Sequence, residues 1–93
     1  MEEQKLQRNL TVFFEKNGFL VVKLIKTTCN GIPDLMVLKD GRVFFIEAKK
    51  DVKTKVRPLQ SYRIEQLKKL GFEAYVIGDF DVEFLNKISL KNT

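Results

Sequence analysis

The sequence predicts an α/β domain, more closely an α+β arrangement in which helices pack on a mixed β-sheet. A helical apolar stripe opens the chain and is followed by short runs rich in β-branched residues. An Asp-Gly turn joins two of these runs, and a second helical segment precedes a further apolar run. The length of 93 residues is that of one domain, residues 1–93, with a core small enough for dimerisation to stabilise it.

Helices are expected at residues 2–17, 58–70 and 79–90. In the first, Leu6, Leu10, Phe13 and Phe14 share one face, and Asn17-Gly18 provides the stop. The second begins at Pro58, which suits the first helical position, and ends before Gly71. The third is the weakest and has Asp79 or Asp81 as its candidate cap.

Strands are expected at residues 19–25, 35–38, 43–48 and 72–77, where the chain is apolar and β-branched. The turn-rich segment 26–33 separates the first two strands, and the basic segment 50–57 is expected to be a loop. The order is therefore helix, three strands, helix, strand and final helix.

The composition excludes several kinds of site. The chain has no histidine and a single cysteine, Cys29, so structural zinc, a serine triad and a Cys–His nucleophile are not expected. A metal here would be held by oxygen, which suits Mg²⁺, Mn²⁺ or Ca²⁺. One cysteine also fits a reducing compartment, and no apolar run approaches the ~20 residues of a membrane span. The net charge of +5 favours a polyanionic partner.

The Asp40-Gly41 turn predicts which residues face each other in the hairpin. If these two residues form the loop, Leu35 lies opposite Ile46 and Asp34 lies opposite Glu47. Directly opposed residues have Cβ atoms roughly 4.5–5.5 Å apart on one face. Lys49 is two residues beyond Glu47 and shares that face. A longer loop or a bulge would shift this register.

Two carboxylates placed together in an apolar strand pair repel each other and lose hydration, unless a cation lies between them. A divalent ion would resolve both problems, and phosphodiester hydrolysis is the chemistry that such an ion beside Lys49 would support. The alternative is ordinary structure. Asp after Pro is common in turns, and Glu-x-Lys is common on a solvated strand edge.

Two further polar residues fall on apolar stripes. Glu3 lies seven residues before Leu10 and so continues the buried stripe of the first helix. Gln60 precedes Ile64 and Leu67 at helical spacing and therefore points inward. The alternatives are that Glu3 occupies a frayed first turn, where an acid favours the helix dipole, and that Gln60 is an ordinary polar residue near a helix start.

Basic and polar residues surround the two carboxylates in the sequence and are candidates for DNA contacts. Because no recognition helix is evident, we expect them to bind the phosphate backbone and the shape of the DNA. A merely solvated loop is the alternative. The candidate DNA-binding residues are Lys23, Lys26, Thr28, Asn30, Lys50, Lys53, Lys55 and Arg57.

Four motifs in order carry a resemblance to a known family. They are EQKLQ at 3–7, GIPD at 31–34, EAK at 47–49 and PLQ at 58–60. GIPD with EAK resembles the PD-(D/E)XK nuclease motif. All four together, over about residues 3–77, resemble the VRR-NUC family, the virus-type replication-repair nuclease domain. Archaeal Holliday junction resolvases have a similar arrangement of a helix glutamate followed by the PD…ExK motif. In this sequence only Gln60 distinguishes the VRR-NUC pattern from theirs.

The resemblance implies a restriction-endonuclease-like αβββαβ core and Mg²⁺- or Mn²⁺-dependent cleavage of DNA. It implies that Glu3, Asp34 and Glu47 ligate the metal, that Ala48 adds its backbone carbonyl, and that Lys49 and Gln60 assist. The resemblance also implies a homodimer that cuts branched DNA such as four-way junctions, as expected for family members that consist of this domain alone.

We therefore expect a structure-selective endodeoxyribonuclease, active as a homodimer in the cytoplasm of a bacterial or phage-infected cell. The first alternative is a non-catalytic DNA-binding module that keeps the nuclease fold. The second is a small interaction protein whose basic face binds an acidic partner.

Overall fold

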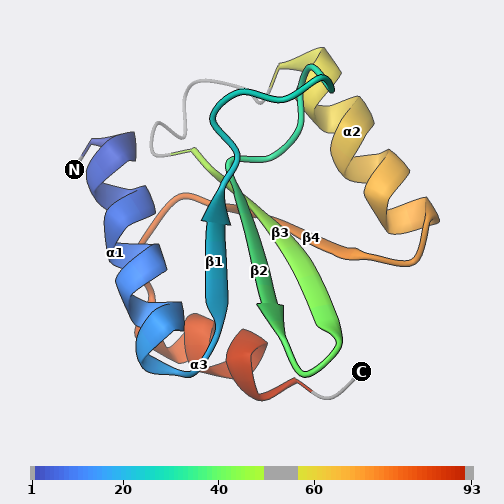
Figure 1. The fold of residues 1–93 in the computed structure, drawn as a ribbon. Coiled ribbons are helices and arrows are strands. Elements are labelled where there is room, and N and C mark those ends of the chain that lie inside the picture. The colour runs from blue at the N-terminus through green and yellow to red at the C-terminus, as the bar shows by residue number, and fades with distance from the viewer. Residues whose placement is uncertain (1, 50–56, 92–93) are drawn as a thin grey trace.

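The order of elements along the chain is the predicted one. The computed structural model describes residues 2–49 and 57–91 (Figure 1). Its helices and strands are α1 (Glu3–Lys16), β1 (Leu20–Lys23), β2 (Leu35–Lys39), β3 (Arg42–Ala48), α2 (Pro58–Lys69), β4 (Glu73–Ile77) and α3 (Val82–Leu90). The candidate loop residues Lys50, Lys53 and Lys55 lie outside the described residues. Within the described ranges, no helix is both long enough and apolar enough to cross a bilayer.

The four strands form one mixed sheet in the order β1-β2-β3-β4. β2 is antiparallel to β1 and β3, whereas β4 runs parallel to β3. Because β4 is parallel to β3, the chain must return from the end of β3 to the end of the sheet where β3 began before β4 can start. Helix α2 is part of this connection. The mixed sheet expected from the sequence is therefore confirmed.

The hairpin register is also confirmed. Lys39 pairs with Arg42 and Leu35 with Ile46, as a two-residue loop requires. Asp40 and Gly41 have φ angles of 50° and 80°, so both central residues adopt the positive φ of a type I′ turn. No bulge interrupts the pairing from Leu35 to Ile46, and the residues that follow on β3 keep the predicted alternation of faces.

Helices cover the two faces of the sheet unequally (Figure 1). The larger core joins α1 and α3 to one face, with Leu6, Leu10 and Phe14 packed near Phe44. The rings of Phe14, Phe19 and Phe44 meet edge to face, with centroids 5.4–5.7 Å apart. The smaller core lies under α2 on the opposite face and centres on Phe45, Ile64 and Ala74.

Several element boundaries differ from the sequence prediction by one residue, and the end of β1 and the start of α3 differ by more. β1 ends at Lys23 instead of residue 25, because its partner β2 begins only at Leu35. Ile25 then donates its backbone N–H to the carbonyl of Lys23, which turns the chain out of the strand. The final helix starts at Val82 because Asp81 caps it by accepting from the N–H of Phe84 at 3.2 Å. The strand predicted at 72–77 begins at Glu73.

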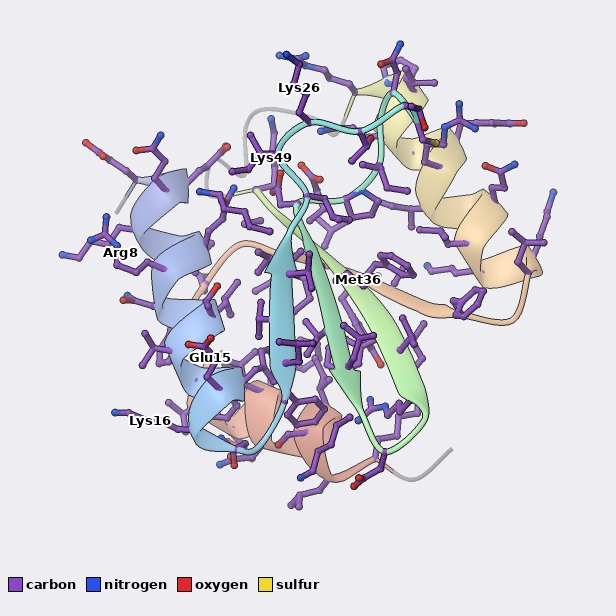
Figure 2. The ribbon with its side chains drawn as sticks, viewed as in Figure 1. Arg8, Glu15, Lys16, Lys26, Met36 and Lys49 are labelled. Carbon is purple, nitrogen blue, oxygen red and sulfur yellow. The ribbon has the colours of Figure 1, made fainter. Side chains whose placement is uncertain are left out.

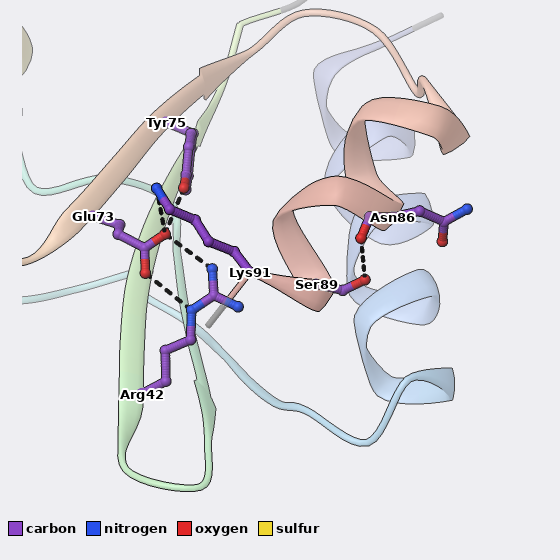
Figure 3. Close-up of polar contacts among 6 residues, drawn as sticks. All are labelled: Arg42, Glu73, Tyr75, Asn86, Ser89 and Lys91. Carbon is purple, nitrogen blue, oxygen red and sulfur yellow. Dashed lines mark hydrogen bonds and ion pairs between the residues drawn. The ribbon is translucent and has the colours of Figure 1, made fainter. Parts of the chain in front are cut away.

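A polar cluster closes the end of the sheet where β3 and β4 begin (Figure 3). Arg42 donates to Glu73 through Nε and Nη2, each at 2.9 Å. Tyr75 also donates its hydroxyl to Glu73, and Lys91 lies 3.7 Å from the same carboxylate. These partners lower the pKa of Glu73 below its usual value, with the Arg42 hydrogen bonds as the largest cause. The candidate site lies at the opposite end of the sheet.

Candidate active site

Asp34 and Glu47 lie at the end of the sheet where β2 begins and β3 ends. The regular pairing of these strands stops at Leu35 and Ile46. Beyond it, Oδ2 of Asp34 accepts a hydrogen bond of 3.0 Å from the backbone N–H of Ala48. The Asp34 charge also raises the pKa of Glu47, so the two carboxylates interact as the register predicted.

Glu47 is the only charged residue that is buried in the described part of the chain, with 3% of its surface exposed. Burial is the main reason that its pKa rises to about 7, and the Asp34 charge adds to the effect. The neighbouring Lys49 charge acts in the opposite direction. Among the described residues, Oε1 of Glu47 has no hydrogen-bond partner. A buried carboxylate oxygen without a partner is costly, so this atom is suited to a ligand.

Gln60 reaches Glu47 from the first turn of α2. Its Nε2 donates to Oε2 of Glu47 at 3.0 Å, and its Oε1 accepts from the backbone N–H of Arg57 at 3.3 Å. The inward orientation expected from the helical spacing is therefore what the structure has. The contact fixes one carboxylate oxygen and leaves Oε1 available.

Asp34 has its own set of electrostatic neighbours. Burial is the largest cause that raises its pKa, and the hydrogen bond from Ala48 opposes it. Glu3 raises the pKa further, whereas a hydrogen bond from Gln7 and the charge of Lys23 lower it. Gln7 was part of the sequence motif without an assigned role. The structure places its side chain next to Asp34.

Glu3 is less buried than its place on the apolar stripe predicted. Its side chain is 45% exposed, and Oε1 lies 4.0 Å from Nζ of Lys49, which is itself only 15% exposed. The structure instead matches the alternative expected from the sequence, because Glu3 is the first residue of α1 and an acid in the first turn favours the helix dipole. The described residues contain no group of three or more acidic, His or Cys side chains close enough to form a metal site. Direct ligation by Glu3 therefore stays a prediction.

The donor set at Asp34 and Glu47 fits a divalent metal ion. Carboxylate oxygens are the ligands that Mg²⁺ and Mn²⁺ prefer. Two interacting carboxylates with raised pKa values, one of them with an unpartnered buried oxygen, form a place where a positive charge would be stabilising. Ala48 is fully buried beside them, and ligation by its carbonyl stays a prediction.

The described DNA-binding candidates lie around this end of the sheet. Lys23, Lys26, Thr28, Asn30 and Arg57 are all exposed. Lys26 and Lys49 lie at the same end of the molecule (Figure 2). Lys23 is close enough for its charge to act on Asp34. The structure thus brings positive charge near the carboxylates, and contact with DNA stays a prediction.

The loop between β1 and β2 is fixed to α2 by contacts that the sequence reasoning missed. Arg63 donates its Nε to the carbonyl of Asn30 at 2.9 Å. Gly31 has a φ of 82°, and a Cβ at this position would lie 2.7 Å from Cγ of Leu59. The glycine of GIPD was the available signal, since only glycine combines that φ with so close a neighbour. Nothing in the sequence pattern marks Arg63.

Comparisons with known proteins agree with this geometry. A family model described as archaeal Holliday junction resolvase (Hjc) matches residues 3–78. A solved structure named "VRR_NUC domain" has a TM-score of 0.78 and 37% identity, over 92% of this chain and 91% of that chain. The chain belongs to the VRR-NUC family. Through the match to the model, it also belongs with the related resolvase family of the PD-(D/E)XK type.

A second solved structure supports the same assignment. It is named "VRR_NUC domain protein" and has a TM-score of 0.69 and 25% identity, over 82% of this chain and 76% of that chain. No protein with a curated description matches the chain significantly. The VRR-NUC assignment confirms the resemblance inferred from the four motifs, and the fold is that of a VRR-NUC nuclease.

Proposed function

We propose that this VRR-NUC protein is a divalent-metal-dependent endodeoxyribonuclease that hydrolyses phosphodiesters in branched DNA, with four-way junctions as the main substrate. The observation that carries the proposal is the Asp34–Glu47 pair, in which a buried Glu47 oxygen has no partner among the described residues. The match to the resolvase model supports the choice of substrate.

In this proposal, Asp34 and Glu47 hold Mg²⁺ or Mn²⁺ together with the carbonyl of Ala48, and Glu3 contributes from the start of α1. A bound ion would withdraw charge from a phosphoryl oxygen and make a coordinated water more acidic. Gln60 orients Glu47 by holding Oε2, so that Oε1 faces the ligand. The amide of Gln7 and the N–H of Ala48 stabilise the charged form of Asp34.

Lys49 is the candidate for direct help to the reaction. Its side chain is mostly buried next to Glu3, and its charge reaches Glu47. An ammonium group held there would donate hydrogen bonds to the attacking water and to the phosphate as negative charge develops. Arginine at position 49 would not be an equivalent replacement, because its guanidinium group is larger, planar and more weakly hydrated than the compact ammonium group of lysine.

The substrate would be held mainly through its phosphates. Lys23, Lys26, Thr28, Asn30 and Arg57 provide exposed donors around the carboxylates, and the basic residues of segment 50–56 would add charge. We also propose a homodimer, because a two-fold axis would present two such sites to the two like strands of a junction. The protein would act in the cytoplasm of a bacterial or phage-infected cell.

The test compares DNA of several shapes with matched sequences. Purified protein is incubated with a synthetic four-way junction, a flap and a linear duplex, in Mg²⁺, Mn²⁺ or EDTA, and its mass in solution is measured. We expect junction cleavage that needs the metal and that falls at least about a hundredfold in Glu47→Gln. Glu65→Gln, which changes an exposed carboxylate of α2, is the matched control.

Other results would select an alternative. Tight DNA binding without cleavage of any substrate would show a binding module that keeps the nuclease fold. Absence of DNA binding at low salt would favour the second alternative, a small interaction protein whose basic face binds an acidic partner. Cleavage that persists unchanged in both Glu47→Gln and Asp34→Asn would disprove the assignment of the site.

A further inference from the structure

Ile25 is the most exposed large apolar side chain in the described part of the protein, with 80% of its surface accessible. It lies between two exposed lysines, Lys23 and Lys26. Single exposed apolar residues are common on protein surfaces and need no special reason. The position of Ile25 at the edge of the candidate site is what makes it informative.

The backbone around Ile25 is held at both ends of its loop. The N–H of Leu24 donates to the carbonyl of Asp34 at 2.8 Å, and the N–H of Ile25 donates to the carbonyl of Lys23 at 3.2 Å. At the other end, Arg63 holds the carbonyl of Asn30. The exposure of Ile25 therefore results from a fixed turn that begins next to a site carboxylate.

Ile25 also lines a pocket that contains Asp34. The pocket has a volume of about 380 Å³ and is formed by loop residues 24–27 and 29–32 together with Asp34. Pockets that take small ligands have volumes of about 300–1,000 Å³. Lys26, Thr27 and Asn30 make its lining mainly polar, and Ile25 adds one highly exposed apolar side chain. This combination suits a ligand that has a charged part and a flat apolar part.

We propose that this pocket takes one unstacked nucleotide next to the cleaved phosphate, with Ile25 against the face of its base. The inference rests on the proposed function and specifies how the site would distinguish branched from linear DNA. In a linear duplex both faces of every base are covered by stacking, so Ile25 has nothing to contact. At a branch point a base can leave the stack, and an apolar side chain then covers its face.

The chain offers a matched control for this role. Leu90 is 79% exposed, almost the same as Ile25, but it lies at the end of α3 beside Lys39 and Arg42. That is the end of the sheet opposite Asp34. If a general loss of surface hydrophobicity weakened DNA binding, changing either residue would have the same effect.

The experiment measures binding in EDTA, so that no cleavage occurs. The full chain and its Ile25→Ser, Ile25→Leu and Leu90→Ser variants are titrated with a four-way junction and with a linear duplex of the same sequence. We expect Ile25→Ser to lose roughly tenfold in affinity for the junction and less than about twofold for the duplex. Ile25→Leu and Leu90→Ser should bind both DNAs as the wild type does.

A second readout reports the base directly. With 2-aminopurine at the branch point, fluorescence should rise when the wild type or Leu90→Ser binds, because the base leaves the stack, and should not rise with Ile25→Ser. Equal affinity of the wild type for both DNAs, or an equal loss on both in Ile25→Ser, would overturn the inference. These results differ from failure of the proposed function, which would appear as absent cleavage with Mg²⁺ or Mn²⁺ while the effect of Ile25 on binding remained.

Discussion

The side-chain amide of Gln60 donates a hydrogen bond of 3.0 Å to Oε2 of Glu47, which joins the first turn of α2 to the interior of β3. The same side chain accepts from the N–H of Arg57, which precedes the helix. The start of α2 and the orientation of the buried carboxylate are thus fixed by one residue. Any movement of α2 relative to the sheet would change the site directly.

Without metal, the stability of the protein should fall as the pH rises from about 4.5 to about 7. Glu47 has its pKa raised from 4.5 to about 7, so the folded state binds a proton in this range that the unfolded state has released. The loss of unfolding free energy caused by ionising the buried Glu47 is absent below this pH range and complete above it, where it amounts to roughly 3 kcal/mol. Denaturant unfolding in EDTA across this range measures it.

The control for this prediction is Glu47→Gln, which cannot titrate at this position. Above pH 7 the variant should be more stable than the wild type, and the difference should disappear near pH 4. The lowered pKa of Glu73 gives the opposite slope, since its stabilisation is lost as the pH falls, but it is shared by both proteins and cancels in the difference. A difference that did not change with pH would contradict the raised pKa.

Mg²⁺ or Mn²⁺ should stabilise the wild type above pH 7. An ion that binds only the folded state adds about 2.7 kcal/mol at a hundred times its dissociation constant. It would also relieve the repulsion between Asp34 and Glu47. Thermal melts with and without each ion measure the shift, and Asp34→Asn should lose most of it. An equal shift in Asp34→Asn would place the ion elsewhere.

Gly31→Ala should be more damaging than Gly41→Ala. Both residues have φ near 80°, so each substitution carries a similar backbone cost of about 1 kcal/mol. At Gly41 an added Cβ meets nothing within 4 Å, whereas at Gly31 it would lie 2.9 Å from the backbone oxygen of Leu59. We expect Gly31→Ala to cost about 1–3 kcal/mol more in unfolding experiments and to reduce junction cleavage.

Arg42→Ala should cost about 3 kcal/mol of stability, because the mostly buried Glu73 loses the two hydrogen bonds that Arg42 donates and keeps only Tyr75 and Lys91 as partners (Figure 3). Lys68→Ala, which removes an exposed pair with Glu65, should cost less than about 0.5 kcal/mol. Chemical denaturation measures both. Cleavage per folded molecule should be normal in Arg42→Ala, since the cluster lies at the end of the sheet opposite the site.

DNA binding should weaken steeply as salt concentration rises. Each phosphate neutralised by a lysine or arginine contributes about −0.9 to the slope of log affinity against log salt for duplex DNA. Replacing Lys26 by Ala should make the slope shallower by about one, on linear and branched DNA alike. Lys87→Ala, in the last turn of α3, should leave the slope unchanged. A slope near zero in the wild type would rule out binding through phosphates.

The parts of the fold that were predicted correctly depend on local chemistry. The positive φ that Asp40 and Gly41 adopt fixes the hairpin, and with it the facing of every residue from Leu35 to Ile46. The proximity of Asp34 and Glu47 could be predicted as well, because they directly flank the paired residues Leu35 and Ile46. Gln60 could be oriented from helical spacing, since the residues after it on the stripe pack against the sheet.

What could not be predicted depends on contacts between distant segments. Glu3 continues an apolar stripe, yet its side chain is 45% exposed, because periodicity contains no information on how the first turn of a helix is covered. The hydrogen bond from Arg63 to Asn30 joins residues 33 positions apart and follows no pattern. The length of β1 was overestimated for the same reason, because its extent depends on where β2 begins.

The parallel pairing of β3 with β4 has a consequence for the part of the chain that follows Glu47. A parallel partner obliges the chain to leave β3 at the end that holds Glu47 and to travel back before β4 can start. In this chain the connection from β3 to α2 therefore begins next to Asp34 and Glu47. Its length and charge can change without altering the pairing of a strand, so residues close to the two carboxylates can be varied while the sheet that positions them is kept.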